Sequence, residues 1–278
     1  MLALTRSRAG GTPALLCRTR GSWLRYENRN SWKRVRNSSL VCLLMLLMVS
    51  GGPLRAQINY KELIKAANSG DPQAMYTYAF ILAVGDETDP KNKVKQSFSS
   101  AFTYYKKAAD AVPGVREAQY KVGFMYEKGS IAFKGGPKAD LVQAAKYYKM
   151  AAEGEDGIGE AKYALARFYK NEWGNLVDSK YAEQSRLLKE AAFQGVTDAQ
   201  AELIVYYLYG KGVIKDLVIA WAWAMVAADQ GDKEGMDKCL NIPELYKKEL
   251  KPGDIDLARK TAEKFKRDIR AVLEKNFK

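Results

Sequence analysis

The stretch AKYYKMAA at residues 145–152 is a near copy of AFTYYKKAA at residues 101–109. Both copies end on a double alanine, and such pairs occur at intervals of 36 to 43 residues: Ala66-Ala67, Ala108-Ala109, Ala151-Ala152, Ala191-Ala192 and Ala227-Ala228. A repeat of this length that contains two helical patterns is typical of a stacked α/α solenoid. Each double alanine therefore predicts the second helix of a unit, here called helix B.

A second pattern predicts the first helix of each unit, helix A. An anchor alanine is followed five residues later by a small or aliphatic residue and eight residues later by Tyr or Leu: Ala74/Ala79/Leu82, Ala118/Gly123/Tyr126, Ala161/Ala166/Tyr169 and Ala199/Ile204/Tyr207. Small side chains let helices approach closely, and larger ones fill the remaining volume. We expect Gly85, Gly129 and Gly210 to end three of these helices, because glycine adopts the left-handed conformation without steric cost. The third unit has Glu172 at this position, so its turn should be shifted.

Helical caps are predicted at both ends of the array. Residues 58–69 form half a unit that would cover the N-terminal end, a short helix is expected from Leu240 to Leu250, and a long charged one from Asp254 to about Phe277. A polar-faced terminal helix keeps the open end of a solenoid soluble. We therefore predict an all-α protein, a right-handed α/α solenoid of about four repeats at residues 57–232 with a helical cap at residues 233–278.

Residues 1–56 precede the solenoid and have the pattern of a secretory signal. The basic residues 33–36 are followed by the ten-residue apolar run LVCLLMLLMV at residues 40–49 and by small residues up to Ala56, after which we expect cleavage. A run of ten is well short of the ~20 residues that cross a bilayer, so we predict no stable membrane span. The protein is thus expected to be exported, either periplasmic or secreted.

Two features of this leader leave alternatives open. Residues 1–31 are rich in arginine and almost free of acids, which would also suit a mitochondrial transit peptide. They are also long for the start of a secretory signal, which favours a translation start nearer Val35. A short uncleaved anchor is a further interpretation of the apolar run.

The net charge of +13 is concentrated in the leader. Residues 1–56 hold ten basic residues and one acid, which leaves 35 basic and 31 acidic residues, or +4, on residues 57–278. A weakly basic body with interspersed signs is an ordinary solvated surface. The balance therefore argues against a nucleic-acid partner, which would need a basic stripe with stacking aromatics.

The amino-acid composition excludes most of the common kinds of catalytic site. The chain has no histidine, and Cys239 is the one cysteine outside the leader, which excludes histidine-dependent triads and cysteine-based zinc sites. No Ser-x-x-Lys, P-loop or Gly-x-Gly-x-x-Gly sequence is present. We predict no catalytic residue, no metal and no cofactor.

The fourth unit carries a family resemblance. YGKGVIKD at residues 209–216 and AWAWAMVAADQGD at residues 220–232 resemble the Sel-1-like repeat, an α/α unit related to the tetratricopeptide repeat. The resemblance covers about residues 58–232, and residues 242–267 are similar to the helical tail that often follows such arrays. It implies a secreted or periplasmic bacterial protein, or an adaptor subunit that holds other proteins together. Some cysteine-rich relatives were described as binding penicillin or hydrolysing β-lactams, and this chain lacks their paired cysteines.

If the units stack as tetratricopeptide repeats do, helix A lines the concave face. Positions one before the anchor and two, six, nine and ten after it then project into a groove. The residues two and six after the anchors are Tyr76, Phe80, Tyr120, Phe124, Tyr163, Arg167, Ala201 and Val205. The outer edge would carry Glu127, Lys128, Lys170 and Asn171. An aromatic row flanked by charges suits a peptide or a glycan strand. The competing interpretation is that these aromatic residues pack between adjacent units.

Taken together, these patterns predict a non-catalytic exported scaffold that mediates protein–protein or peptide interactions. The alternative is a cell-envelope enzyme or accessory protein that acts on peptidoglycan or on β-lactam-like substrates.

Overall fold

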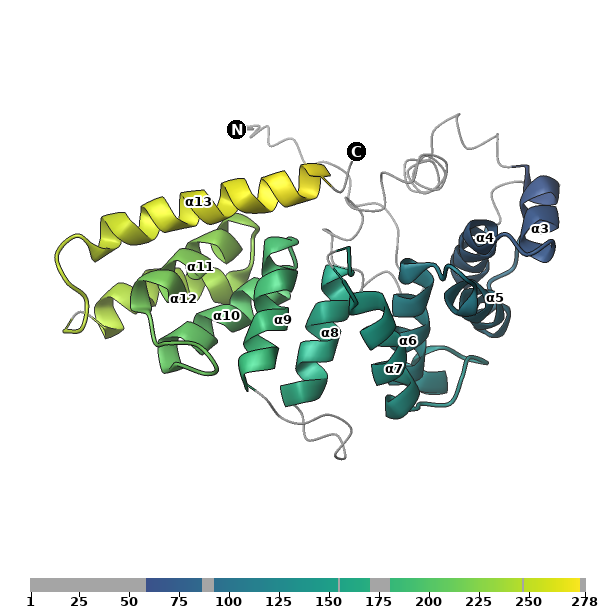
Figure 1. Ribbon diagram of the computed structural model, residues 1–278, viewed down its shortest axis with the longest axis horizontal. Coiled ribbons are helices and arrows are strands. Elements are labelled where there is room, and N and C mark those ends of the chain that lie inside the picture. The colour runs from purple at the N-terminus through teal and green to yellow at the C-terminus, as the bar shows by residue number, and fades with distance from the viewer. Residues whose placement is uncertain (1–58, 87–92, 155, 171–180, 247, 276–278) are drawn as a thin grey trace, which may run out of the picture.

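The computed structural model describes residues 59–86, 93–154, 156–170, 181–246 and 248–275 (Figure 1). Its helices are α3 (Tyr60–Asn68), α4 (Pro72–Val84), α5 (Phe98–Asp110), α6 (Arg116–Ala132), α7 (Leu141–Ala152), α8 (Gly159–Lys170), α9 (Tyr181–Phe193), α10 (Thr197–Tyr209), α11 (Leu217–Asp229), α12 (Lys233–Leu245) and α13 (Asp254–Lys275). An isolated antiparallel bridge joins Asp86 and Val94. The predicted all-α class is confirmed, while the predicted leader lies outside the described residues.

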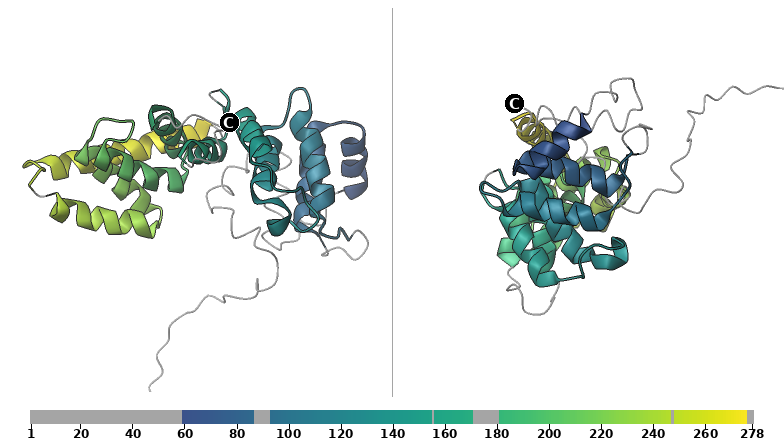
Figure 2. Two further views of the ribbon diagram at one scale, coloured as in Figure 1. Left: turned by 90° about the horizontal axis from the view of Figure 1, so that it is seen from below. Right: turned by 90° about the vertical axis from the view of Figure 1, so that its right-hand side faces the viewer.

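The helices stack as pairs along the long axis of the molecule. The pairs α4/α5, α6/α7, α8/α9 and α10/α11 follow one another, with α3 packed on α4 at one end and α12 beside α11 at the other (Figures 1 and 2). Helix α13 runs lengthwise over the last pairs, against α11 and α9. This repeated arrangement of four helix pairs with helical ends is the predicted solenoid. Within the ranges above, no helix is long and apolar enough to cross a bilayer.

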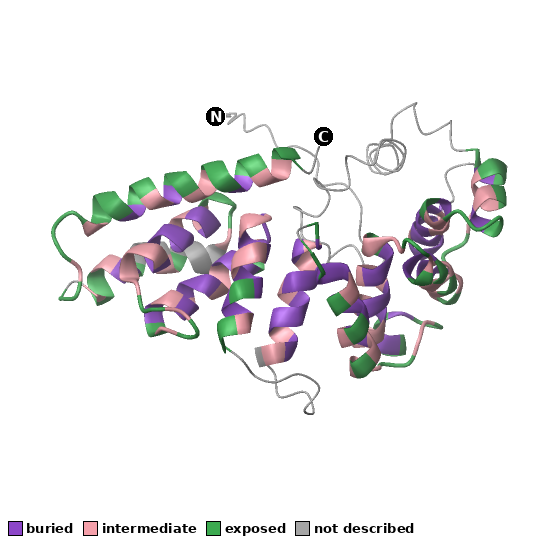
Figure 3. Cartoon of the chain, viewed as in Figure 1, coloured by how far each residue is buried: buried purple, intermediate pink, exposed green. Residues whose placement is uncertain are grey.

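The alanines of the repeat form the contacts between helices. The anchors Ala118, Ala161 and Ala199 are fully buried, and at least one alanine of every double pair is buried as well (Figure 3). The small residue five positions after the anchor has a steric cause at Gly123, where an added Cβ would lie 2.8 Å from the ring of Tyr148. Helices A and B of this unit therefore approach too closely for any larger side chain.

Glycine breaks the helices at the expected positions. Gly85 and Gly210 follow the last residues of α4 and α10 with φ of 76° and 68°. At Gly129 the backbone leaves helical geometry, with φ of 64°, before one further turn completes α6. The predicted turn around Glu172 in the third unit lies outside the described residues.

The C-terminal region differs from its prediction in one respect. The short helix expected at Leu240–Leu250 instead spans Lys233–Leu245 and includes Pro243 in its last turn. Gly231, with φ of 81°, ends α11 and redirects the chain just as Gly195 does before α10. Helix α12 thus takes the place of helix A in a further unit. The sequence concealed this because Gly235 stands where the anchor alanine would be.

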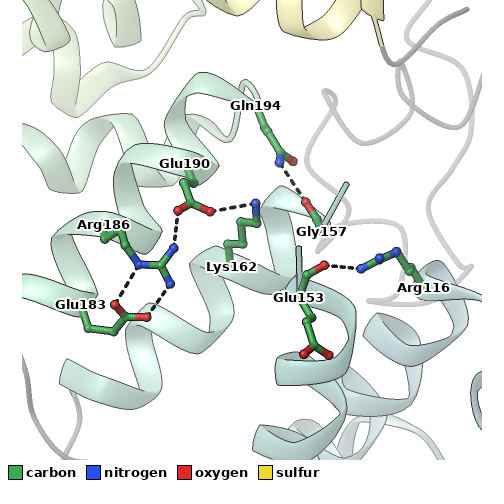
Figure 4. Close-up of polar contacts among 8 residues, drawn as sticks. All are labelled: Arg116, Glu153, Gly157, Lys162, Glu183, Arg186, Glu190 and Gln194. Atoms are coloured by element: carbon green, nitrogen blue, oxygen red, sulfur yellow. Dashed lines mark hydrogen bonds and ion pairs between the residues drawn. The ribbon is translucent and has the colours of Figure 1, made fainter. Parts of the chain in front are cut away.

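A glutamine next to the anchor joins consecutive units. Gln119 and Gln200 each follow an anchor alanine, and their Nε2 atoms donate to the carbonyl oxygens of Ala109 (3.3 Å) and Ala192 (3.1 Å). These acceptors belong to the second alanine of the preceding double pair, near the end of helix B. Carbonyls at a helix end lack intrahelical partners, so each glutamine satisfies one of them. The third unit has Lys162 at this position, and its ammonium instead pairs with Glu190 of α9 at 2.9 Å (Figure 4).

Replacing Gln200 with leucine should destabilise the fold by about 2 kcal/mol, because buried partners would lose their hydrogen bonds. Gln200 is fully buried, and its Oε1 also accepts from Gln230 Nε2 at 2.9 Å. Leucine keeps the volume and removes both bonds. Urea unfolding would measure the change, with the exposed Gln73→Leu as a control expected to stay within about 0.5 kcal/mol of the parent. Equal stabilities for the two variants would contradict this role.

Candidate functional site

A cavity of about 380 Å³ opens between α8, α9 and α10. Its lining combines aromatic rings, acidic groups and two small apolar side chains. The lining residues are Tyr163, Tyr181, Asp198, Ala201, Glu202, Val205, Tyr206, Lys211 and Asp232. This volume lies within the range of about 300–1,000 Å³ that is common for ligand pockets.

The cavity lies on the helix A face on which the sequence pattern predicted a groove. Tyr163 and Ala201 are two residues after their anchors, Val205 is six residues after its anchor, and all three line the cavity. Asp198, one residue before its anchor, was also expected on this face and lines the cavity too. The third and fourth units therefore bring predicted groove positions together around one hollow.

One wall of the cavity is held rigidly by a buried hydrogen bond. Tyr206 is 3% exposed, and its hydroxyl donates to Oε1 of the fully buried Gln184 on α9 at 2.9 Å. Burial raises the pKa of Tyr206 to about 12, and the nearby Glu202 and Tyr181 act in the same direction. Tyr206 is therefore held in one position at the wall of the cavity, with little of its ring accessible.

Three carboxylates surround the cavity and influence one another. Asp198 lies at its exposed rim, and partial loss of water around the carboxyl raises the pKa of Asp198. The negative charges of Asp232 and Glu202 raise it further, while the positive charge of Arg167 opposes them. Lys211 is the one basic residue in the lining, and its ammonium lies 5.8 Å from the ring centre of Tyr209. The lining therefore carries an excess of negative charge.

In the first unit, the predicted aromatic row packs inside the protein. Tyr76 and Phe80 are 3% and 4% exposed, and the ring of Tyr76 lies 5.7 Å from that of Tyr105 on α5. The contact with Tyr105 joins α4 to α5, so Tyr76 packs between the two helices of its own unit rather than between adjacent units. Neither residue offers a surface to a partner in this structure.

In the second unit the aromatic row is half-buried. Tyr120 and Phe124 stack on each other with ring centres 6.3 Å apart, and Tyr120 also lies 5.8 Å from Tyr148 on α7. Phe124 contacts Phe133, whose ring centre is 5.8 Å away. These side chains both pack within the unit and reach the surface, so their part in partner binding stays a prediction.

The carboxylate of Glu127 contacts two other predicted partner-binding residues, Lys128 and Arg167. The side chain of Glu127 is 4% exposed, and its Oε1 lies 2.6 Å from Lys128 Nζ and 3.8 Å from Arg167 Nη1. Its Oε2 accepts a hydrogen bond from the Tyr148 hydroxyl at 2.6 Å, and burial, followed by the Glu127 charge, keeps the pKa of Tyr148 well above its usual value. Glu127 thus links α6, α7 and α8. Lys170 ends α8, but its side chain, like Asn171, lies outside the described residues.

Several lining residues were not identified from the sequence: Tyr181, Glu202, Tyr206, Lys211 and Asp232. Glu202 and Tyr206 lie on α10 itself, three and seven residues after the anchor Ala199, at positions that the groove pattern did not include. The other three enter the cavity from the start of α9, the turn after α10 and the turn before α12, which counting from an anchor does not reach. Asp232 follows Gly231 as Asp71 follows Gly70, a signal for the start of a helix A. In the described part of the chain, no group of three or more Cys, Asp or Glu side chains is arranged to hold a metal ion.

Comparison with known proteins matches one family model, and the similar proteins include two solved structures and one curated protein. The Sel1 repeat model matches residues 72–112, 116–156 and 197–232. A protective antigen of uropathogenic Escherichia coli with an SLR fold has a TM-score of 0.61 and 22% identity, over 88% of this chain and 46% of its own. A Sel1 repeat protein from Oxalobacter formigenes has a TM-score of 0.55 and 25% identity, over 75% of this chain and 78% of its own.

A curated mouse protein is also similar to this chain. DAP3-binding cell death enhancer 1 of Mus musculus is 43% identical over 137 residues, which are 49% of this chain. The match spans only 25% of the mouse protein's length.

Proposed function

We propose that this chain is a non-catalytic scaffold that binds a partner protein through an extended segment seated in the cavity between α8, α9 and α10. The Sel1 repeat model matches three of its segments, and Sel1 repeats typically mediate protein–protein interactions. The observation that carries this proposal is the convergence of helix A positions from two successive units on one hollow. Tyr163 comes from the third unit, and Ala201 and Val205 come from the fourth.

The side chains around the cavity suit a peptide. Tyrosine supplies a large contact area with few rotatable bonds, and interface hot spots are rich in this residue. The hydrogen bond from Tyr206 to Gln184 fixes one ring before any partner arrives, so less freedom is lost on binding. The small side chain of Ala201 leaves room for a partner chain beside these rings.

The proposed class of partner and the proposed location of this protein in the cell rest on different observations. The name of the mouse relative describes a protein that binds another protein, which supports a protein partner here as well. For location, we retain export directed by the leader, with the mitochondrion as the alternative that the arginine-rich residues 1–31 suit.

Site-specific photo-crosslinking would test the proposed surface. A photoreactive amino acid placed at Val205 in the full chain, expressed in its own cell, should crosslink to a small number of proteins. The control position is Val142 on α7, which is 56% exposed and lies outside the cavity lining. Discrete crosslinked species at Val205 and none at Val142 are expected. The same species at both positions, or none at Val205, would count against binding in this cavity.

A further inference from the structure

We propose that the cavity between α8, α9 and α10 binds a basic side chain, arginine or lysine, within an extended segment of the partner protein. This inference rests on the proposed scaffold function and specifies the chemistry of its partner. It combines the charge of the lining, the aromatic rings within it and the size of the hollow.

The charge of the cavity is opposite to that of the protein around it. Residues 57–278 together carry +4, as counted above, yet the cavity lining holds Asp198, Glu202 and Asp232 against the single base Lys211. Asp232 and Glu202 raise the pKa of Asp198 and the positive charge of Arg167 lowers it, so the three carboxylates act on a common region that one nearby guanidinium only partly offsets. A cationic group placed among them would relieve this repulsion, whereas an anionic partner would increase it.

The aromatic part of the lining favours the same class of ligand. Tyrosine rings attract cations over their faces within about 6 Å. Tyr163 already shows this preference within the chain, because the guanidinium of Arg167 lies 6.0 Å from its ring centre. Tyr181, which is 52% exposed, adds a second accessible ring to the lining, so a guanidinium or ammonium group would meet aromatic side chains and carboxylates together.

The size of the cavity distinguishes an organic cation from a metal ion. A hollow of about 380 Å³ has room for a long basic side chain with its peptide backbone. Within the described ranges, the acidic groups are not arranged as a metal site. The three carboxylates are therefore better placed to bind the cationic end of a lysine or arginine side chain than to coordinate a metal ion.

Binding of defined peptides to the full chain would test this inference. The probes are fluorescently labelled octapeptides of glycine and serine, one carrying two arginines and a matched one carrying two glutamines in their place. Fluorescence anisotropy should show binding of the arginine peptide that weakens at high ionic strength. The glutamine peptide should bind at least about tenfold more weakly, because it offers no charge to the carboxylates.

Asp198→Asn supplies the matched variant. It should weaken binding of the arginine peptide about tenfold, while Asp268→Asn, on the exposed face of α13, changes the net charge equally and should leave binding unchanged. Because the pKa of Asp198 is raised by its surroundings, losing this charge should keep the melting temperature at or slightly above that of the parent. Weaker binding without loss of stability would thus assign the effect to the cavity.

Two outcomes would overturn the inference: equal binding of the arginine and glutamine peptides, or an Asp198→Asn variant that binds as the parent does. The crosslinking experiment distinguishes this failure from that of the scaffold function. Crosslinks at Val205 to a partner whose crosslinked segment lacks basic residues would leave the scaffold function standing and refute the basic ligand. Loss of both signals would refute both.

Discussion

Replacing Trp223 with alanine is expected to destabilise the C-terminal half of the solenoid by about 3–5 kcal/mol, the usual cost of removing a large buried aromatic side chain. Trp223 of α11 is 1% exposed, and its ring stacks on Phe265 of α13 with centres 4.5 Å apart and planes 27° apart. Phe193, at the end of α9, meets both rings edge-on at 5.2 and 5.5 Å. The three rings join α9, α11 and α13, so alanine would open a cavity where these helices meet.

Chemical denaturation followed by circular dichroism would measure this loss. The control is Tyr209→Ala on α10, which removes a 65% exposed ring and should change stability by less than about 0.5 kcal/mol. Hydrogen exchange should also show faster exchange along α13 in the Trp223 variant, because the stacking partner of Phe265 is gone. Similar stabilities for the two alanine variants would show that the aromatic cluster does not hold α13 in place.

The helix pairs were predictable because one physical requirement recurs along the chain. Close approach of helices A and B demands a small residue at a fixed position, and Gly123 against Tyr148 shows how strict that demand is. Small residues meet this requirement in the first three units (Ala79, Gly123 and Ala166), the fourth unit has Ile204 there, and the anchor and double alanines recur in every unit, so the pattern is visible in a single sequence. Helix α12 was misplaced because its anchor position holds Gly235, so the same requirement is met there by a different residue.

The groove was predictable only in part, since helical position gives the direction of a side chain and not what it meets. Tyr76 and Tyr163 hold the same position after their anchors, yet the first is buried and the second lines the cavity. Tyr76 packs against Tyr105 on α5 of its own unit, a contact that the helix A pattern does not describe. The negative charge of the cavity could not be predicted from the helix A pattern either. Asp198 and Asp232 lie far apart in sequence and on different turns, and only the fold brings their charges together.

Gly212→Ala is expected to cost about 3 kcal/mol or more, through two effects that add. Gly212 has φ of 64°, which alone disfavours alanine, and its added Cβ would fall on the backbone carbonyl of Tyr181, far inside the 3.0 Å limit that real Cβ atoms respect. The backbone atoms of Tyr181 cannot rotate away from the added Cβ as the end of a flexible side chain can. Ser185 holds the two segments together, since its hydroxyl donates to the carbonyl oxygens of Gly212 at 3.0 Å and Ala182 at 2.9 Å.

Gly253→Ala separates these two effects. Gly253 has φ of 95°, but no heavy atom lies within 4 Å of its added Cβ, so alanine there should cost only about 1–2 kcal/mol from the backbone conformation. The clash at Gly212 also displaces Tyr181, which lines the cavity, so Gly212→Ala should weaken binding of the arginine peptide in native conditions, whereas Gly253→Ala should not. Thermal unfolding and anisotropy on the same two proteins would measure both quantities. If Gly212→Ala and Gly253→Ala lost the same amount of stability, the turn after α10 would be able to move away from α9. The wall of the cavity formed by Tyr181 and Lys211 would then not be rigid, and a rigid wall is needed to select a basic side chain.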